Sequence, residues 1–159
     1  MPSGNLSYKF AHFPCSKLPG GFIKRPMVPV TLKYGNKEPI DVDMLLDSGS
    51  DFTTISKDLA EALEIDIDEC EKGTATGVGG DTTIAVTVIN ISFGQRGFEY
   101  NKIVPLQITL KGDTNSLPLL GRQPLFEDFD VHFRMSFADP KGKFVLTKVT
   151  KTRDPKKFK

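Results

Sequence analysis

The feature that most constrains this chain is an acidic turn at the end of an apolar run. Residues 44–46 (Met-Leu-Leu) lead directly into Asp47, which is followed by Ser48 and Gly49. Glycine reaches backbone dihedrals that are closed to other residues, so the chain can reverse tightly here. A second β-favouring run follows at residues 53–55. The pattern predicts a carboxylate at the tip of a buried strand, either solvated in a loop or presented in a cleft.

Two further motifs follow at wider spacing. Residues 77–80 read Gly-Val-Gly-Gly and predict a mobile hairpin tip, because glycines leave few side chains to pack. Residues 118–122 read Pro-Leu-Leu-Gly-Arg. Asp-Ser-Gly alone is a common turn tripeptide. The three motifs in this order resemble the retropepsin-like aspartic proteases, which include the retroviral and retrotransposon enzymes and their cellular relatives.

The resemblance covers roughly residues 23–133. It implies an all-β fold, a retropepsin-like closed β-barrel with one or two short helices, assembled as a two-fold homodimer. We therefore expect an N-terminal arm at 1–22, a protease domain at 23–150 and a basic tail at 151–159. The arm and a long C-terminal hairpin depart from the retroviral pattern.

The resemblance also implies roles for single residues. The catalytic residue is Asp47, and the substrate-binding or supporting residues are Ser48, Gly49, Ser50, Asp51, Gly77, Val78, Gly79, Gly80, Gly121 and Arg122. Ser48 would bond across the dimer beneath the site, and Arg122 would pair with Asp51. The flap at 77–80 would close over an extended peptide, with Val78 touching the substrate. Residues 24–26 are similar to a retroviral stretch whose arginine crosses the dimer interface. We also expect the Ser50 hydroxyl to donate a hydrogen bond to ionised Asp47 and lower its pKa.

The chemistry of such a site requires two carboxylates that share one proton across a water molecule. The chain has a single Asp-Ser-Gly, and 159 residues leave no room for a second lobe that would carry another. The second Asp47 must then come from a second copy of the chain. The sequence therefore predicts a homodimeric aspartic endopeptidase acting on a peptide or protein. The alternative is a non-catalytic module of the same fold that dimerises or binds peptides.

Composition excludes several other classes. Basic and acidic residues nearly balance, 21 against 20, and the net charge of +1 favours no particular partner. Two cysteines and two histidines make no metal pattern, so we expect neither a metal nor another cofactor. No stretch approaches the ~20 apolar residues that span a bilayer, and no signal peptide is evident, so a cytoplasmic protein without a membrane partner is expected. Nucleic-acid binding would rest on the basic tail alone and is not expected.

Local patterns predict the individual elements. Alternating apolar residues indicate strands, and Ser56 is a suitable helix cap. Residues 1–22 are expected to be an irregular lead-in. The predicted elements are strands at 28–34, 40–46, 84–93 (with a bend or bulge), 98–110 (broken near Pro105), 130–137 and 143–149, a helix at 57–65 and a helical turn at 124–129.

Overall fold

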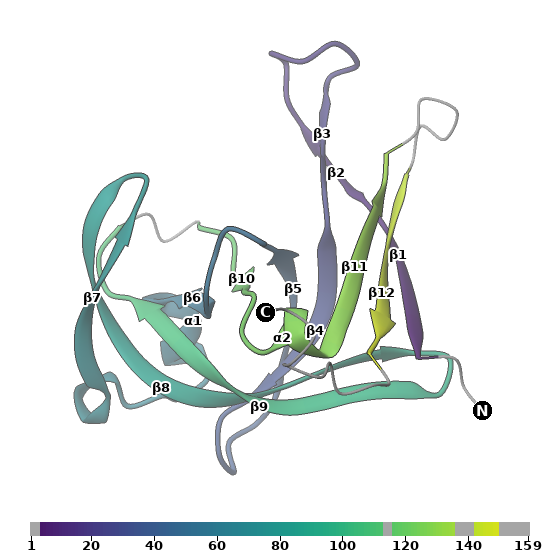
Figure 1. The fold of residues 1–159 in the computed structure, drawn as a ribbon. Coiled ribbons are helices and arrows are strands. Elements are labelled where there is room, and N and C mark those ends of the chain that lie inside the picture. The colour runs from purple at the N-terminus through teal and green to yellow at the C-terminus, as the bar shows by residue number, and fades with distance from the viewer. Residues whose placement is uncertain (1–3, 113–115, 136–141, 150–159) are drawn as a thin grey trace, which may run out of the picture.

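The computed structural model describes residues 4–112, 116–135 and 142–149. Two short α-helices, α1 (Lys57–Ala62) and α2 (Leu125–Asp128), and a 3₁₀ turn, η1 (Ile67–Glu69), interrupt a chain of strands (Figure 1). The expected basic tail, residues 151–159, lies outside the described residues. The strands are β1 (Asn5–Lys9), β2 (Ala11–Pro14), β3 (Phe22–Arg25), β4 (Met27–Lys33), β5 (Ile40–Leu46), β6 (Thr53–Ser56), β7 (Glu71–Gly77), β8 (Gly80–Gln95), β9 (Phe98–Thr109), β10 (Leu119–Leu120), β11 (Phe129–Arg134) and β12 (Lys143–Lys148).

The centre of the fold is a closed barrel of six strands. They follow the order β4-β5-β10-β6-β9-β8, and β8 pairs back onto β4, where Thr31 lies opposite Ser92. Closure removes the unpaired edges that an open sheet exposes. The predicted closed β-barrel with two short helices is confirmed.

Strand β4 shows how the sequence specifies the barrel interior. Val28, Val30 and Leu32 are at most 2% exposed, whereas Pro29 and Lys33 face solvent. Successive side chains of a strand point to opposite faces, so this alternation puts one face in the core. Burying each such side chain contributes about 1.5–3 kcal/mol. The core continues through Ile89, Ile91, Val104, Leu106, Ile108 and Leu120.

The N-terminal segment differs from the irregular lead-in expected over residues 1–22. Strand β1 pairs with β12, which pairs with β11, so β1 completes a three-stranded sheet. Leu6, Tyr8 and Phe10 are buried, and the rings of Tyr8 and Phe10 each lie 5.4 Å from the ring of Phe144. Apolar residues at every second position are a strand pattern, which the surrounding glycine, proline and serine residues obscure.

The next segment forms an isolated hairpin. Within the described residues β2 and β3 pair only with each other, from Ala11 opposite Arg25 to Pro14 opposite Phe22. Strand β3 runs into β4, and Met27 at the start of β4 lies opposite Leu45 near the end of β5. The hairpin therefore rises from the end of the barrel at which β5 finishes, and Figure 1 shows it standing clear of the barrel.

Strands β8 and β9 form a long curved hairpin. Their register is unbroken from Ile84 to Gln95 of β8, so the face change expected within 84–93 is a bend and not a bulge. Strand β9 is also continuous through Pro105, which corrects the expected break. Strand β6 joins the second edge of β9 only from Leu106 onward. The proline, which has no N–H to donate, thus lies just before that edge is paired.

Helix α1 begins at the expected cap but ends early. The Ser56 hydroxyl accepts a hydrogen bond from the Leu59 N–H at 3.3 Å, which satisfies one of the unpaired N–H groups of a helix start. The helix ends at Ala62 and not at residue 65, because Glu64 has a φ of +57°, in the left-handed region. None of the helices in the described ranges is long and apolar enough to cross a bilayer.

Candidate active site

The backbone of Asp47 is held on both sides by other strands. The Leu46 N–H donates to the Pro26 carbonyl at 2.9 Å, and the Asp47 N–H donates to the Leu120 carbonyl at 3.1 Å. Pro26 lies between β3 and β4, and Leu120 ends β10. Asp47 is partly buried, whereas Ser48 beside it is exposed. The end of β5 therefore presents the carboxylate at the surface on a rigid support.

Hydrogen bonds within the turn orient the carboxylate. The Gly49 N–H donates to Asp47 Oδ1 at 2.9 Å, and the Ser50 N–H donates to the Asp47 carbonyl at 3.3 Å. A Cβ atom at Gly49 would lie 3.2 Å from the same Oδ1. Glycine therefore lets the backbone approach the carboxylate closely enough to bind it. The acid is positioned by the main chain.

The Ser50 side chain does not have the role expected of it. Its hydroxyl donates to the Phe52 carbonyl at 2.8 Å, so its single proton is not directed at Asp47. Thr54 Oγ1 donates to the same carbonyl at 3.2 Å. The expected tuning of the carboxylate by Ser50 is therefore wrong for this conformation. Both hydroxyls stabilise the return of the chain into β6. Phe52 was missed by the sequence analysis, because a backbone acceptor leaves no signal in residue type.

A second loop braces the turn from the far end of the sequence. Strand β10 lies between β5 and β6, parallel to the first and antiparallel to the second. The Arg122 N–H donates to the Ser50 carbonyl, and the Gln123 N–H donates to the Asp51 carbonyl, both at 2.9 Å. Gly121, between β10 and these contacts, allows the two backbones to meet, since an added Cβ would lie 2.3 Å from the Phe52 carbonyl carbon. The structure thus brings the motif at 118–122 against the acidic turn.

Arg122 also pairs with Asp51 through its side chain, as the resemblance implied. The Arg122 guanidinium donates to Asp51 Oδ1. The two side chains are 49% and 64% exposed, so water screens the pair in a single chain. Exposed ion pairs contribute about 0–1 kcal/mol. The pair therefore orients the two loops more than it stabilises the fold.

The glycine-rich hairpin stands to one side of the turn. Strands β7 and β8 meet at Gly77 opposite Gly80, and the Val78 side chain at the tip is fully exposed. Below the tip, Thr76 Oγ1 donates to Asp81 Oδ1 at 2.6 Å. Figure 1 shows the hairpin arching at the left of the barrel, away from the end of β5. In one chain, Asp47 to Asp51 therefore meet Gly121 and Arg122, and residues 77–80 form a separate arm.

A hollow of about 720 Å³ lies elsewhere, between the β4–β5 hairpin and the tip of β8–β9. Its lining includes Thr31, Asp41 and Phe98 but not Asp47. The described residues contain no cluster of three or more histidine, cysteine or acidic side chains that could hold a metal. The turn at Asp47 thus lies outside this hollow, with the carboxylate partly buried at the end of β5.

Comparisons with known proteins agree with this geometry. A family model described as aspartyl protease matches residues 28–123, which include the acidic turn, the glycine-rich hairpin and the second loop. A comparison with curated protein sequences finds no significant match.

Solved structures with a related fold were also found. A retropepsin-like aspartic protease from Rickettsia conorii superposes with a TM-score of 0.52 and 17% identity, covering 93% of this chain and 95% of that one. The protease of EIAV in complex with the inhibitor HBY-793 gives 0.48 and 20%, covering 65% and 88%. The retroviral protease-like domain of Ddi1 from Leishmania major gives 0.42 and 15%, covering 78% and 94%. The Rickettsia structure shares the barrel architecture over nearly the whole length of both chains.

Proposed function

Since this chain belongs to the aspartyl protease family, we propose that it is an aspartic endopeptidase that acts as a two-fold homodimer. The observation that carries the proposal is Asp47 itself, whose Oδ1 accepts the Gly49 N–H at 2.9 Å at the exposed end of β5. The chain contains a single Asp-Ser-Gly. A two-fold axis beside the turn would supply the second carboxylate.

In this proposal the two Asp47 carboxylates share one proton and hold a water molecule between them. Like charges about 3 Å apart do not both ionise, so one acid stays protonated. The ionised carboxylate removes a proton from the water as the water oxygen bonds to the scissile carbonyl carbon. The protonated carboxylate gives its proton to the carbonyl oxygen. The carboxylate that is now ionised then removes a proton from one hydroxyl of the tetrahedral diol as the C–N bond breaks, and the departing amine takes a proton from the carboxyl group that received one from water.

Two other features support an extended peptide as the substrate. The hairpin at 77–80 is long enough to arch over a bound strand, and Val78 offers it an apolar tip. Closure of such a hairpin would exclude water from the carboxylates. Ser48, Gly49 and Asp51, on the exposed surface of the turn, are the residues we assign to the floor of the site.

The test is cleavage of an unbiased peptide mixture by wild type and by Asp47→Asn. The variant keeps the size of the side chain and should fold, yet it should produce no cuts, because the amide cannot act as a general base. Asp43→Asn is the matched control: it changes an exposed aspartate of the same strand and should leave cleavage intact. Undiminished cleavage by pure Asp47→Asn would refute the assignment.

The homodimer has a separate test. Specific activity of the wild type should fall on dilution through the dissociation range of the dimer. A fully active monomer in sedimentation would contradict the shared site. A wild type that dimerises and binds peptides without cutting them would instead favour the non-catalytic module.

A further inference from the structure

From the projecting hairpin we infer that residues 11–25, here called the clasp hairpin, grip a second copy of this chain beside the Asp47 turn. This inference rests on the proposed homodimer and adds the surface that holds it together. The clasp hairpin comprises β2, β3 and the loop between them. Four observations support it: its position, its isolation, its exposed apolar side chains and its charge.

Its position follows from the strand directions. Strand β5 runs toward Asp47, β4 is antiparallel to it, and Leu46 N donates to the Pro26 carbonyl. The chain before Met27 must therefore continue beyond the Asp47 end of the barrel. The four residues of β3 alone extend it by roughly 13 Å. Figure 1 shows the end of β5 between the arched β7–β8 hairpin and the clasp hairpin, so a copy placed over Asp47 would meet both.

Its isolation is one of strand pairing. The two strands pair only with each other within the described part of the molecule. A lone two-stranded hairpin is at best marginally stable in water and needs another surface to pack on. Inside the hairpin, Arg25 lies over the Phe13 ring at 4.6 Å, and the His12 and Phe22 rings are 5.9 Å apart. Phe13 and Phe22 lie on opposite faces of the hairpin, so each face offers an aromatic ring that a partner can bury.

Exposed apolar side chains gather at this end. Leu18 at the tip is 45% exposed and Phe22 is 53% exposed. Near the base of the hairpin, Phe133 and Met135 are 49% and 62% exposed, and the Phe133 ring stacks on that of Phe10 at 6.1 Å. Several large apolar side chains left in water at one end of a molecule favour an interaction site there.

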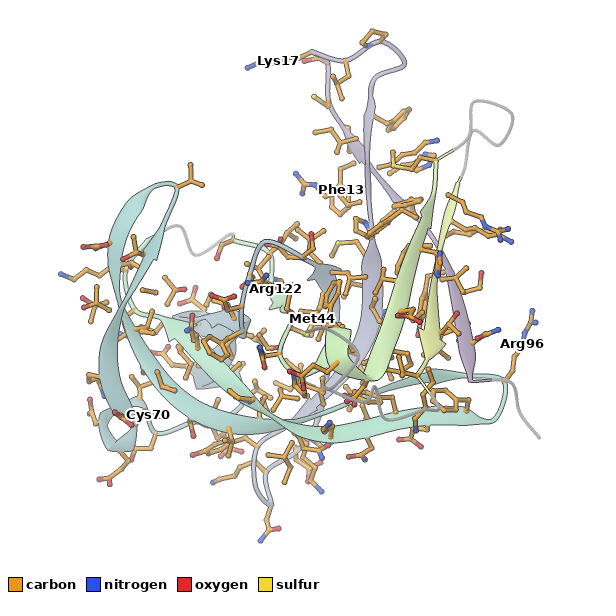
Figure 2. All side chains as sticks on the ribbon, in the orientation of Figure 1. Phe13, Lys17, Met44, Cys70, Arg96 and Arg122 are labelled. Carbon is orange, nitrogen blue, oxygen red and sulfur yellow. The ribbon has the colours of Figure 1, made fainter. Side chains whose placement is uncertain are left out.

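The charges of the clasp hairpin and of the acidic turn indicate which partner binds. The clasp hairpin carries Lys17, Lys24 and Arg25 and no acidic residue, whereas the turn it would meet carries Asp47 and Asp51 and no basic residue. Figure 2 shows Lys17 at the outer end of the hairpin and Phe13 nearer the barrel. A basic arm that emerges beside its own acidic turn is complementary to the same turn of a two-fold mate. The occupant is therefore a second copy of this chain.

The apolar contact is tested by sedimentation of the full chain. Leu18→Ser with Phe22→Ser should weaken the dimer by about tenfold or more, the scale of losing an interface hot spot. The control pair, Val88→Ser with Ile103→Ser, removes side chains that are 55% and 66% exposed on the outer face of the barrel and should leave the dissociation constant unchanged. An unchanged constant for the first pair, or a monomeric wild type, overturns the inference.

The charge contribution is tested with Lys17→Glu against Lys33→Glu, which lies at the opposite end of β4. Lys17→Glu should weaken the dimer, more so at low salt, and Lys33→Glu should not; equal effects would overturn the charge argument.

Sedimentation measures the dimer without any catalysis, so its result can be separated from the cleavage result. A dimer that responds in this way without cutting peptides refutes the proposed endopeptidase alone. Cleavage by a dimer indifferent to Leu18 and Phe22 refutes the clasp alone.

Discussion

A Cβ atom added to Gly121 would lie 2.3 Å from the carbonyl carbon and 2.4 Å from the carbonyl oxygen of Phe52. Both of these atoms belong to the backbone, so no side chain can rotate away to make room. The second loop and the acidic turn can therefore lie this close only with glycine at position 121.

Gly121→Ala should destabilise the protein by about 1–3 kcal/mol, because the overpacked loops must separate. Urea unfolding of the wild type and the variant measures the difference. Gly73→Ala is the control, since its Cβ would meet Ile84 at an ordinary 3.7 Å. Equal stability of the wild type and Gly121→Ala would show that the loops are not in close contact.

Ser50→Ala should reduce stability by about 0.5–1.5 kcal/mol, the net value of the hydrogen bond to the Phe52 carbonyl. The acid limb of the pH–rate profile should stay where it is, because the hydroxyl donates at 2.8 Å to that carbonyl and not to Asp47. Thr54→Val, which removes a second donor to the same acceptor, should behave alike. Movement of the acid limb to higher pH in Ser50→Ala would restore the direct role first expected of this residue.

Asp128 should make stability depend on pH. Burial raises the pKa of this carboxyl, but hydrogen bonds from Lys102 at 2.7 Å and Tyr100 at 2.6 Å outweigh burial and lower the pKa below its ordinary 3.8. A lowered folded-state pKa stabilises the fold above the unfolded value, and this stabilisation is lost as pH falls through the folded value. Asp128→Asn should therefore cost about 1 kcal/mol at neutral pH, and the gap to wild type should close below about pH 4.

Tyr100→Phe serves as the control for Asp128. It removes one donor but leaves Lys102 paired with the carboxylate, so part of the pH dependence should persist. Unfolding curves from pH 2 to 7 would decide the matter. A gap between wild type and Asp128→Asn that stays constant over this range would mean that the carboxylate is not stabilised in the folded state.

Val78→Ala should lower kcat/KM by up to about tenfold, the loss expected from two methyl groups that are buried only when substrate binds. Stability should not change, because the side chain is fully exposed in the single chain. Val88→Ala is the matched control on the outer face of the barrel.

In hydrogen exchange, the backbone amides of residues 77–80 should exchange rapidly in the free protein and become protected when a transition-state mimic is bound. Equal protection with and without the mimic argues against a closing flap.

The parts of the fold that follow local patterns were predictable from the sequence. Strand β5 spans the predicted 40–46, and Ser56 caps α1 as expected. Alternation and capping depend on neighbouring residues, so they can be read from a short window. The pairing of Asp51 with Arg122 was predicted from the family resemblance, and their ion pair confirms it.

Other parts depend on contacts between distant segments. Strand β1 is ordered because it packs against β12 near the other end of the chain, and its own composition suggested a loop. The acceptor for Ser50 is a backbone carbonyl, which any residue could supply. The early end of α1 reflects the left-handed conformation of Glu64, a position at which the sequence carries no glycine. Each of these differences arises where tertiary structure overrides a local preference.

The insertion of β10 beside β5 has a consequence for how the protein is made. Asp47 leaves the ribosome well before Leu120, whose carbonyl holds the Asp47 N–H, and synthesis at ~5–20 residues per second separates the two by several seconds. Throughout that interval the nascent chain carries the aspartate without the loop that braces it. We therefore expect the braced geometry of the turn to form late in translation, only after Leu120 has emerged.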